Sequence, residues 1–237
     1  MHTENLLLAA LPREVYEHLE KNLEQVSLSS NKILHHPGET IEDVYFPLNC
    51  LISVTITMKD GSTVEAGVIG NREMVGINAF MGGTETTQTE YIVQVAGDAV
   101  RMKAEPLRKE FDQNKQMRDV MLKYTQAFIA QISQNVACNR RHSIENRFAR
   151  WLLESSDRIQ SDELDLSQEF ISHMLGVRRS GVTETARHVQ EKGPIQYSRK
   201  KIKIVDRHGL EHISCECYET LKDEYNRLLK FNLRENR

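Results

Sequence analysis

Positively charged side chains gather in residues 176–205, where eight of thirty residues are Lys or Arg and two are Glu. Guanidinium and ammonium groups bind phosphates, and Arg can also bond guanine through two hydrogen bonds. The chain as a whole has 237 residues and a net charge of -3. Such a local basic patch on an acidic protein indicates a polyanionic partner, and a solvated cationic surface is the alternative interpretation.

Residues 166–183, which begin before the basic patch and overlap its first part, have the layout of a helix-turn-helix. Ser167 can cap a first helix, whose apolar residues form one face, and Gly176 can turn the chain at low steric cost. A second helix is expected over about 179–191, with Gly193 and Pro194 as its stop signal. These signals predict two helices joined by a tight turn.

The second helix separates an apolar face from a polar one, as a recognition helix in a DNA major groove does. Two strand-like runs follow, 195–197 and 201–205, and their basic connection predicts a wing that contacts phosphate. We expect Arg179, Ser180 and Thr183 to read bases. The full set of candidate DNA-binding residues is Gln168, Arg178, Arg179, Ser180, Thr183, Arg187, Arg199, Lys200 and Lys201.

Short strands are expected earlier in the chain. Residues 52–58 alternate between apolar and polar, and Asp60-Gly61 makes a tight turn into 63–69, which predicts a β-hairpin. Further strand-like runs, separated by turn residues, indicate an antiparallel sandwich or barrel. Those runs are 32–36, 43–46, 90–96 and 99–103.

A long helix follows Pro106, because apolar residues recur there at spacings of three and four. Its stripe could cover the sheet or pair with a second copy of the chain, and we expect the homodimer. The predicted dimerisation residues are Met117, Met121, Tyr124, Phe128 and Ile132. The predicted domains are a β-roll sensor (1–115), the dimerisation helix and hinge (116–142) and a winged helix-turn-helix (143–237), which is an α+β fold.

Composition argues against a membrane protein, a secreted protein and a disulfide-rich scaffold. Hydrophobic residues make up 39% and charged residues 27% of the chain, and the early apolar run 6–11 is too short for a signal peptide or a membrane span. We therefore expect a cytoplasmic protein with no membrane contact. Four scattered cysteines do not form a disulfide scaffold. Cys215 and Cys217, two apart in an expected strand, would point the same way, so a redox or metal role is an alternative to the structural role that we expect.

The order of β-roll, long helix and winged helix-turn-helix resembles the Crp/Fnr family of bacterial transcription regulators. The resemblance covers nearly the whole chain, and its most specific stretches are 166–183, 138–142 with 150–153, and 206–211 with 215–218. It implies a homodimer on a palindromic DNA operator, an effector site in the β-roll, and RNA polymerase as a further candidate partner. Arg179 matches the family's base-reading arginine, whereas Ser180 stands where the cyclic-AMP receptor branch has glutamate.

The expected sensor departs from the cyclic-nucleotide pattern of that family. Glu73, with Met74 beside it, could match the glutamate that binds ribose, but the phosphate-binding arginine would fall near Thr89, and residues 73–100 contain no Lys or Arg. A phosphate buried without a cation costs several kcal/mol. Glu73 and Met74 are therefore expected in an effector pocket that does not take cyclic AMP, with the effector unknown and no cofactor predicted.

Two alternatives remain open from the sequence. One is a regulator that does respond to a cyclic nucleotide. The other is a cupin-like ligand-binding protein or enzyme, which His35, His36 and Glu39 would serve as metal ligands. No further His occurs before His142, so these residues are better interpreted as a turn, and no catalytic or metal residues are predicted.

Overall fold

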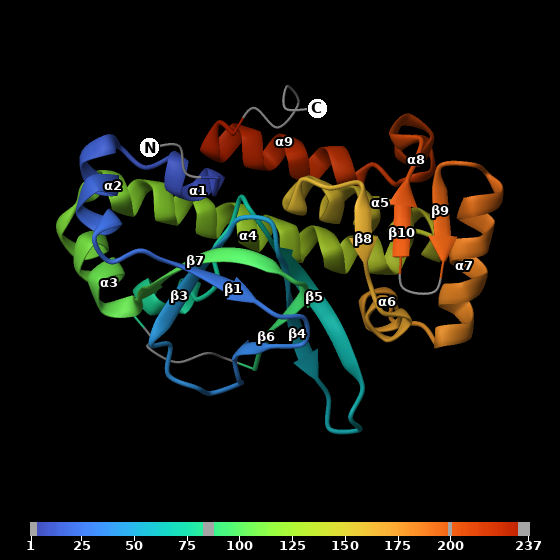
Figure 1. The fold of residues 1–237 in the computed structure, drawn as a ribbon, viewed down its shortest axis with the longest axis horizontal. Helices are drawn as coiled ribbons and strands as arrows, with labels where there is room; N and C mark the ends of the chain where they lie inside the picture. The colour runs from blue at the N-terminus through green and yellow to red at the C-terminus, as the bar shows by residue number, and fades with distance from the viewer. Residues whose placement is uncertain (1–3, 83–87, 199–200, 232–237) are drawn as a thin grey trace.

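Antiparallel strands build the N-terminal part of the computed structural model, which describes residues 4–82, 88–198 and 201–231. Two sheets, with strand orders β1-β7-β3 and β2-β6-β4-β5, enclose one hydrophobic core and form the β-roll (Figure 1). The strands are β1 (Glu24–Leu28), β2 (Ile33–His35), β3 (Asp43–Pro47), β4 (Leu51–Thr57), β5 (Thr63–Ile69), β6 (Glu90–Val95) and β7 (Gly97–Lys103). The expected runs all lie in strands, and β1 was not predicted.

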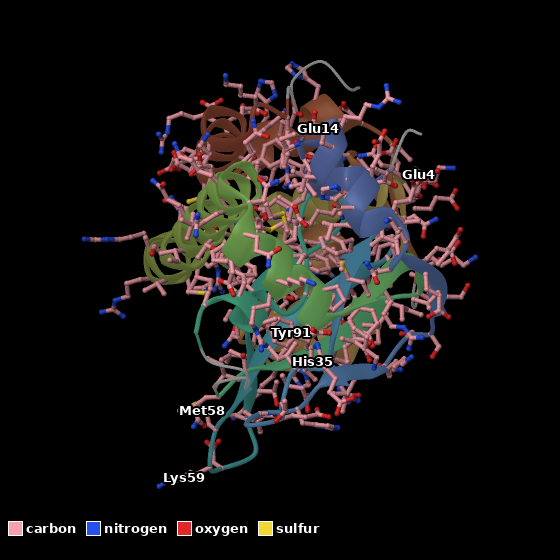
Figure 2. The ribbon with its side chains drawn as sticks, turned by 90° about the vertical axis from the view of Figure 1, so that its left-hand side faces the viewer. Glu4, Glu14, His35, Met58, Lys59 and Tyr91 are labelled. Atoms are coloured by element: carbon pink, nitrogen blue, oxygen red, sulfur yellow. The ribbon has the colours of Figure 1, made fainter. Side chains whose placement is uncertain are left out.

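The hairpin of β4 and β5 extends furthest from the body of the molecule. Ser62 donates from its backbone N–H to Asp60 Oδ1 at 2.9 Å, and Gly61 has a φ of 83°, which few other residues adopt. Met58 and Lys59 lie at its tip, away from the rest of the chain (Figure 2). The predicted turn is therefore confirmed.

Short helices cover the roll and lead into the long helix α4 (Lys115–Arg141), which crosses most of the molecule (Figure 1). Asn114 caps α4, because its side chain accepts hydrogen bonds from the N–H groups of Gln116 and Met117. The short helices are α1 (Leu6–Ala9), α2 (Arg13–Glu20), the 3₁₀ helix η1 (Ile77–Phe80) and α3 (Ala104–Gln113).

The structure corrects the predicted dimerisation face of α4. The stripe of apolar residues packs into the core of the roll within the same chain, so a second copy cannot reach it. The side chains concerned are Met117, Met121 and Tyr124 (0% exposed), Phe128 (3% exposed) and the partly buried Ile132. A different face of the helix carries exposed apolar residues, namely Leu122, Ile129 and Val136.

The C-terminal part is a winged helix-turn-helix whose hydrophobic core also includes Leu51 and Val68 of the β-roll. Its sheet has the order β8-β10-β9, and β8 was missed by the sequence analysis. The elements are α5 (Ile144–Ile159), β8 (Glu163–Asp165), α6 (Gln168–Leu175), α7 (Arg179–Glu191), β9 (Ile195–Ser198), β10 (Lys201–Ile204), α8 (Arg207–Ile213) and α9 (Cys217–Leu229). The fold class predicted from the sequence is confirmed.

Helix α9 returns along α4 and lies beside it (Figure 1). The strand expected around Cys215 and Cys217 is wrong, because Cys217 begins α9 and Cys215 lies in the turn before it. Tyr225 and Leu229 of α9 join the core of the β-roll. Within the described residues, no helix is both long and apolar enough to cross a membrane.

Candidate nucleic-acid interface

Helices α6 and α7 form the helix-turn-helix as predicted. The Ser167 hydroxyl accepts a hydrogen bond from the N–H of Phe170 at 3.1 Å, which caps α6. Gly176 ends α6 with a φ of 64°, a left-handed conformation that favours glycine. Helix α7 buries Val182, Ala186 and Val189 against the domain core and so turns its opposite face outward.

The outward face of α7 is polar and open to solvent. Ser180, Thr183, Glu184 and Arg187 line an open depression on this face, and all four are exposed. Glu184 was not among the predicted contacts, although its place four residues after Ser180 and three before Arg187 on a predicted helix put it on the same side. A carboxylate there can accept a hydrogen bond from the amino group of cytosine.

Arg179, which is expected to read bases, and Arg187, which is expected to contact bases or phosphates, are each paired with a carboxylate of the same chain. Arg179 Nη2 lies 2.9 Å from Glu169 Oε2, and Arg187 Nε lies 3.5 Å from Glu191 Oε1. All four side chains are more than half exposed. Exposed ion pairs stabilise a protein by about 0–1 kcal/mol, so either arginine can leave its partner at little cost.

Gln168 is partly buried and has a positioning contact. Its Nε2 donates to Tyr197 Oη at 2.6 Å and approaches Thr183 Oγ1 at 3.4 Å. Gln190 of the predicted polar face accepts from the N–H of Tyr197 at 2.6 Å, which holds α7 to β9. These contacts join the recognition helix, the first helix and the wing into one unit.

The remaining predicted contacts lie at the two ends of this surface. Arg178 is exposed directly before α7, and Lys201 is exposed at the start of β10. Arg199 and Lys200 lie outside the described residues.

The predicted effector residues lie at the joint between the β-roll and this domain. Glu73 is 0% exposed. Its Oε2 accepts from the N–H of Gly70 at 2.7 Å, and its Oε1 accepts from Arg158 Nε of α5 at 3.1 Å and Arg72 Nε at 3.3 Å. Met74 is held through its backbone N–H and carbonyl by the Tyr124 hydroxyl. Glu73 is therefore not accessible to a ligand in this arrangement, which differs from the predicted pocket.

Arg158 fills the space beside Glu73. A Cβ atom on Gly70 would lie 2.3 Å from Arg158 Cβ, so only glycine permits this approach. Burial alone would lower the pKa of Arg158, but the carboxylates of Glu73 and Glu154 outweigh it and raise that pKa. The guanidinium is therefore a fixed positive charge between the two domains.

A second contact between the domains involves Glu65 of β5. Its carboxylate accepts from Trp151 Nε1 of α5 at 3.0 Å and from the Ser53 hydroxyl. Burial raises the pKa of Glu65 to about 7, although both hydrogen bonds and the charge of Arg150 lower it. The two domains thus meet through buried polar groups.

The position expected to bind ribose is occupied by groups of the protein itself. The ribose-binding position would be Glu73, whose two oxygens are already bonded. The nearest cation after it in sequence, Arg101, is partly exposed and paired with Glu24 at 2.6 Å. No described side chain between them carries a positive charge for a phosphate.

Comparisons with known proteins agree with this architecture. Residues 25–114 match the family model of the cyclic nucleotide-binding domain, and residues 146–213 match that of the Crp-like helix-turn-helix domain. The global nitrogen regulator of Nostoc sp. is 21% identical over 183 residues, which cover 73% of this chain and 82% of that protein.

Solved structures share the fold. FixK2 from Bradyrhizobium japonicum has a TM-score of 0.69 at 15% identity, and the match covers 81% of this chain and 98% of that one. A transcriptional regulator of the CRP/FNR family from Thermus thermophilus has a TM-score of 0.64 at 17% identity, with 81% and 98% covered. The c-di-GMP responsive global regulator CLP from Xanthomonas campestris has a TM-score of 0.64 at 12% identity, with 81% and 99% covered.

The family models match the two halves of one architecture in the order that the Crp/Fnr family has, and together they cover well over half of the chain. The fold is that of transcription regulators and not of enzymes, so the cupin-like alternative is wrong. This chain belongs to the Crp/Fnr family of transcription regulators with a DNA-binding helix-turn-helix.

Proposed function

We propose that this protein is a homodimeric regulator that binds a palindromic DNA operator through α7 and does not use a cyclic nucleotide as its effector. Such a regulator would act in the cytoplasm, with RNA polymerase as a second partner in the way that the family resemblance implies. The operator-binding part of this proposal depends on one observation, the exposed polar face of α7.

That face combines the groups that read base edges. Arg179 and Arg187 can each bond the O6 and N7 atoms of guanine, and Ser180 and Thr183 can reach bases or phosphates. Both arginines are held only by exposed glutamates. Lys201 at the start of β10 is placed to neutralise a phosphate at the edge of the same surface.

The proposed dimer uses the exposed face of α4. Leu122, Ile129 and Val136 are 51%, 55% and 69% exposed and stand seven residues apart. A seven-residue repeat keeps apolar side chains on one side of a helix, as in a coiled-coil seam. The opposite side of α4 is covered by the β-roll and by α9, so a second copy of α4 is the matching partner. A dimer would present two α7 helices to successive major grooves about 34 Å apart.

The proposed independence from cyclic nucleotides follows from Glu73 and Arg158. A nucleotide ribose would have to displace a buried guanidinium from Glu73, and the domains would have to separate there. A ligand shifts such an equilibrium only if it binds one arrangement more tightly than the other. The described residues between Glu73 and Arg101 include no Lys or Arg that could supply this affinity through a phosphate.

Selection from random duplex DNA tests the operator-binding claim. We expect an enriched palindrome whose half-sites are about one helical turn apart, bound without added nucleotide. Addition of cyclic AMP or cyclic GMP should leave the affinity within about twofold. If no palindrome is enriched at moderate salt, the proposal is wrong, and micromolar binding of either nucleotide in calorimetry overturns the effector claim.

The dimer face has a separate test. Ile129→Glu should convert the dimer to a monomer in analytical ultracentrifugation, because it places two buried charges opposite each other in the seam. Met58→Glu is the matched control, since Met58 is 56% exposed but lies at the hairpin tip (Figure 2). A wild-type monomer, or equal effects of the two variants, would contradict this interface.

A further inference from the structure

Four side chains with metal-binding atoms meet where the end of α4 lies against the start of α9. Cys138 is in the last turn of α4 and His142 follows the helix, while Cys215 precedes α9 and Cys217 begins it. One donor atom from each lies within 4.8 Å of all the others. The three cysteines are 0%, 6% and 0% exposed, so the cluster is closed to solvent on its sulfur side.

Two of the separations between donor atoms are close to those around a tetrahedral zinc ion. With Zn–S of about 2.3 Å and Zn–N of about 2.0–2.1 Å, tetrahedral angles give S–S of about 3.8 Å and S–N of about 3.6 Å. Cys138 Sγ and Cys215 Sγ are 3.5 Å apart, and Cys217 Sγ and His142 Nδ1 are 3.6 Å apart. A disulfide would need about 2.05 Å, so the sulfurs are spaced for a shared ion.

Neighbouring side chains supply the outer contacts that zinc ligands use. His142 Nε2 lies 3.1 Å from a carboxylate oxygen of Glu216, which leaves Nδ1 free to face the sulfurs. A carboxylate partner fixes the tautomer and orientation of a metal-binding imidazole. Gln134 Nε2 donates to Cys217 Sγ at 3.0 Å, a contact that orients a thiolate. The cluster therefore has both the ligand atoms and the hydrogen-bonding partners that orient them.

Simple hydrophobic packing explains the cluster less well. The three cysteines form a buried group of their own, separate from both domain cores. The positive charge of Arg150 acts on all three sulfurs, and that of Arg147 acts on Cys138 and Cys215. Three thiolates and one Zn²⁺ carry a net charge of -1, which nearby guanidinium groups compensate.

We propose that Cys138, His142, Cys215 and Cys217 bind one Zn²⁺ ion in a closed Cys₃His structural site. All four coordination positions come from the protein, so no position is left for a substrate. Each thiol gives up its proton on binding, so uptake of zinc releases about three protons per ion at neutral pH.

The site would fasten α9 to the hinge between α4 and α5. Helix α9 also reaches the β-roll, since Tyr225 Oη accepts from Gln131 Nε2 at 3.3 Å and Arg72 lies over its ring at 5.1 Å. Zinc would thus fix a helix that contacts the hinge at one end and the core of the β-roll at the other. An effect on DNA affinity rests on the proposed function, whereas metal binding does not.

Metal analysis of the full-length protein, purified under reducing anaerobic conditions, tests the site. We expect about one zinc per chain, and after exchange into Co²⁺ a visible spectrum of tetrahedral cobalt with thiolate-to-cobalt charge transfer. Cys217→Ser and His142→Ala should lower the bound zinc at least tenfold. Cys50→Ala should retain it, because Cys50 is buried in the roll core and apart from the cluster.

Two further variants distinguish the loss of a zinc ligand from the loss of folding. His142→Cys should keep the zinc and shift the cobalt spectrum toward four-sulfur coordination. Glu216→Gln, at a 75% exposed side chain, should weaken zinc affinity about tenfold or more without unfolding the protein.

Three results would overturn the proposal. The first is reduced, folded protein that binds added Zn²⁺ no more tightly than Cys217→Ser does. The second is a Cys138–Cys215 disulfide found by mass spectrometry in metal-free, anaerobically purified protein, which would assign the pair to thiol redox chemistry. The third is an unchanged cobalt spectrum in His142→Cys, which would remove His142 from the ligand set.

Discussion

Arg158 of the DNA-binding domain donates from Nε to Glu73 Oε1 of the β-roll at 3.1 Å, and neither side chain is exposed. A buried ion pair is costly to break from one side, because the remaining charge has no solvent. This pair therefore couples the position of α5 to the position of Glu73 in the β-roll. A sensor event that moved Glu73 would be transmitted directly to the domain that carries α7.

Arg158→Met should lower the free energy of unfolding by about 3–5 kcal/mol, because it leaves Glu73 buried with less compensation. Urea unfolding followed by fluorescence of Trp151, the chain's single tryptophan, measures it. Arg101→Met is the matched control: Arg101 also pairs with a glutamate of the chain, but the pair is exposed, so about 1 kcal/mol or less is expected. Equal losses in the two variants would contradict the coupling.

Glu65 should make the protein less stable as pH rises from 4.5 to about 7. Its pKa is about 7 in the folded protein and 4.5 as the reference value, so in this window the unfolded chain loses the proton first. The free energy of unfolding then falls with pH and levels off above about 7. A shift of this size corresponds to on the order of 3 kcal/mol.

Glu65→Gln keeps the hydrogen-bonding shape without a charge. It should flatten the stability curve between these pH values and exceed the wild type in stability at pH 8. Glu163→Gln, which changes an exposed glutamate of β8, should leave the slope in place. A slope unchanged by Glu65→Gln would assign the pH dependence to another group.

Gly181→Ala should stabilise the protein by about 0.5–1 kcal/mol, because glycine in a helix interior is unfavourable relative to alanine. A Cβ there meets Val177 at 3.6 Å, an ordinary contact. Gly70→Ala should do the opposite, since its Cβ would lie 2.3 Å from Arg158 Cβ. In thermal unfolding, the midpoint temperature should rise for Gly181→Ala and fall for Gly70→Ala. Loss of DNA affinity in a stabilised Gly181→Ala would show that a phosphate approaches this backbone.

The helix-turn-helix could be predicted because its signals are local. Ser167, Gly176 and Gly193 mark helix ends through their own conformations, and the hairpin turn at Asp60 does the same. The third strand of the wing, Glu163–Asp165, is only three residues long and gives no such periodic signal. Its pairing with β10 depends on tertiary contacts.

The exposed apolar face of α4 and the surroundings of Glu73 could not be derived in this way. Helix α4 has two apolar faces, and periodicity alone does not say that Tyr124 faces the chain's own roll while Ile129 faces outward. The strict seven-residue spacing of the exposed set was the available signal. The contact of Glu73 with Arg158 joins residues 85 positions apart, so neither spacing nor composition points to it.

Specific and random DNA affinities of Arg179→Ala and Lys201→Ala test the central claim, that α7 reads sequence and the wing holds phosphate. Arg179→Ala should lower the ratio of specific to random affinity by about 1–3 kcal/mol, or about 5- to 150-fold, and relax one operator position. Lys201→Ala should weaken all sequences alike and reduce the salt slope by about one unit per protomer. If Arg179→Ala weakens specific and random DNA equally, α7 is not the reader of the operator.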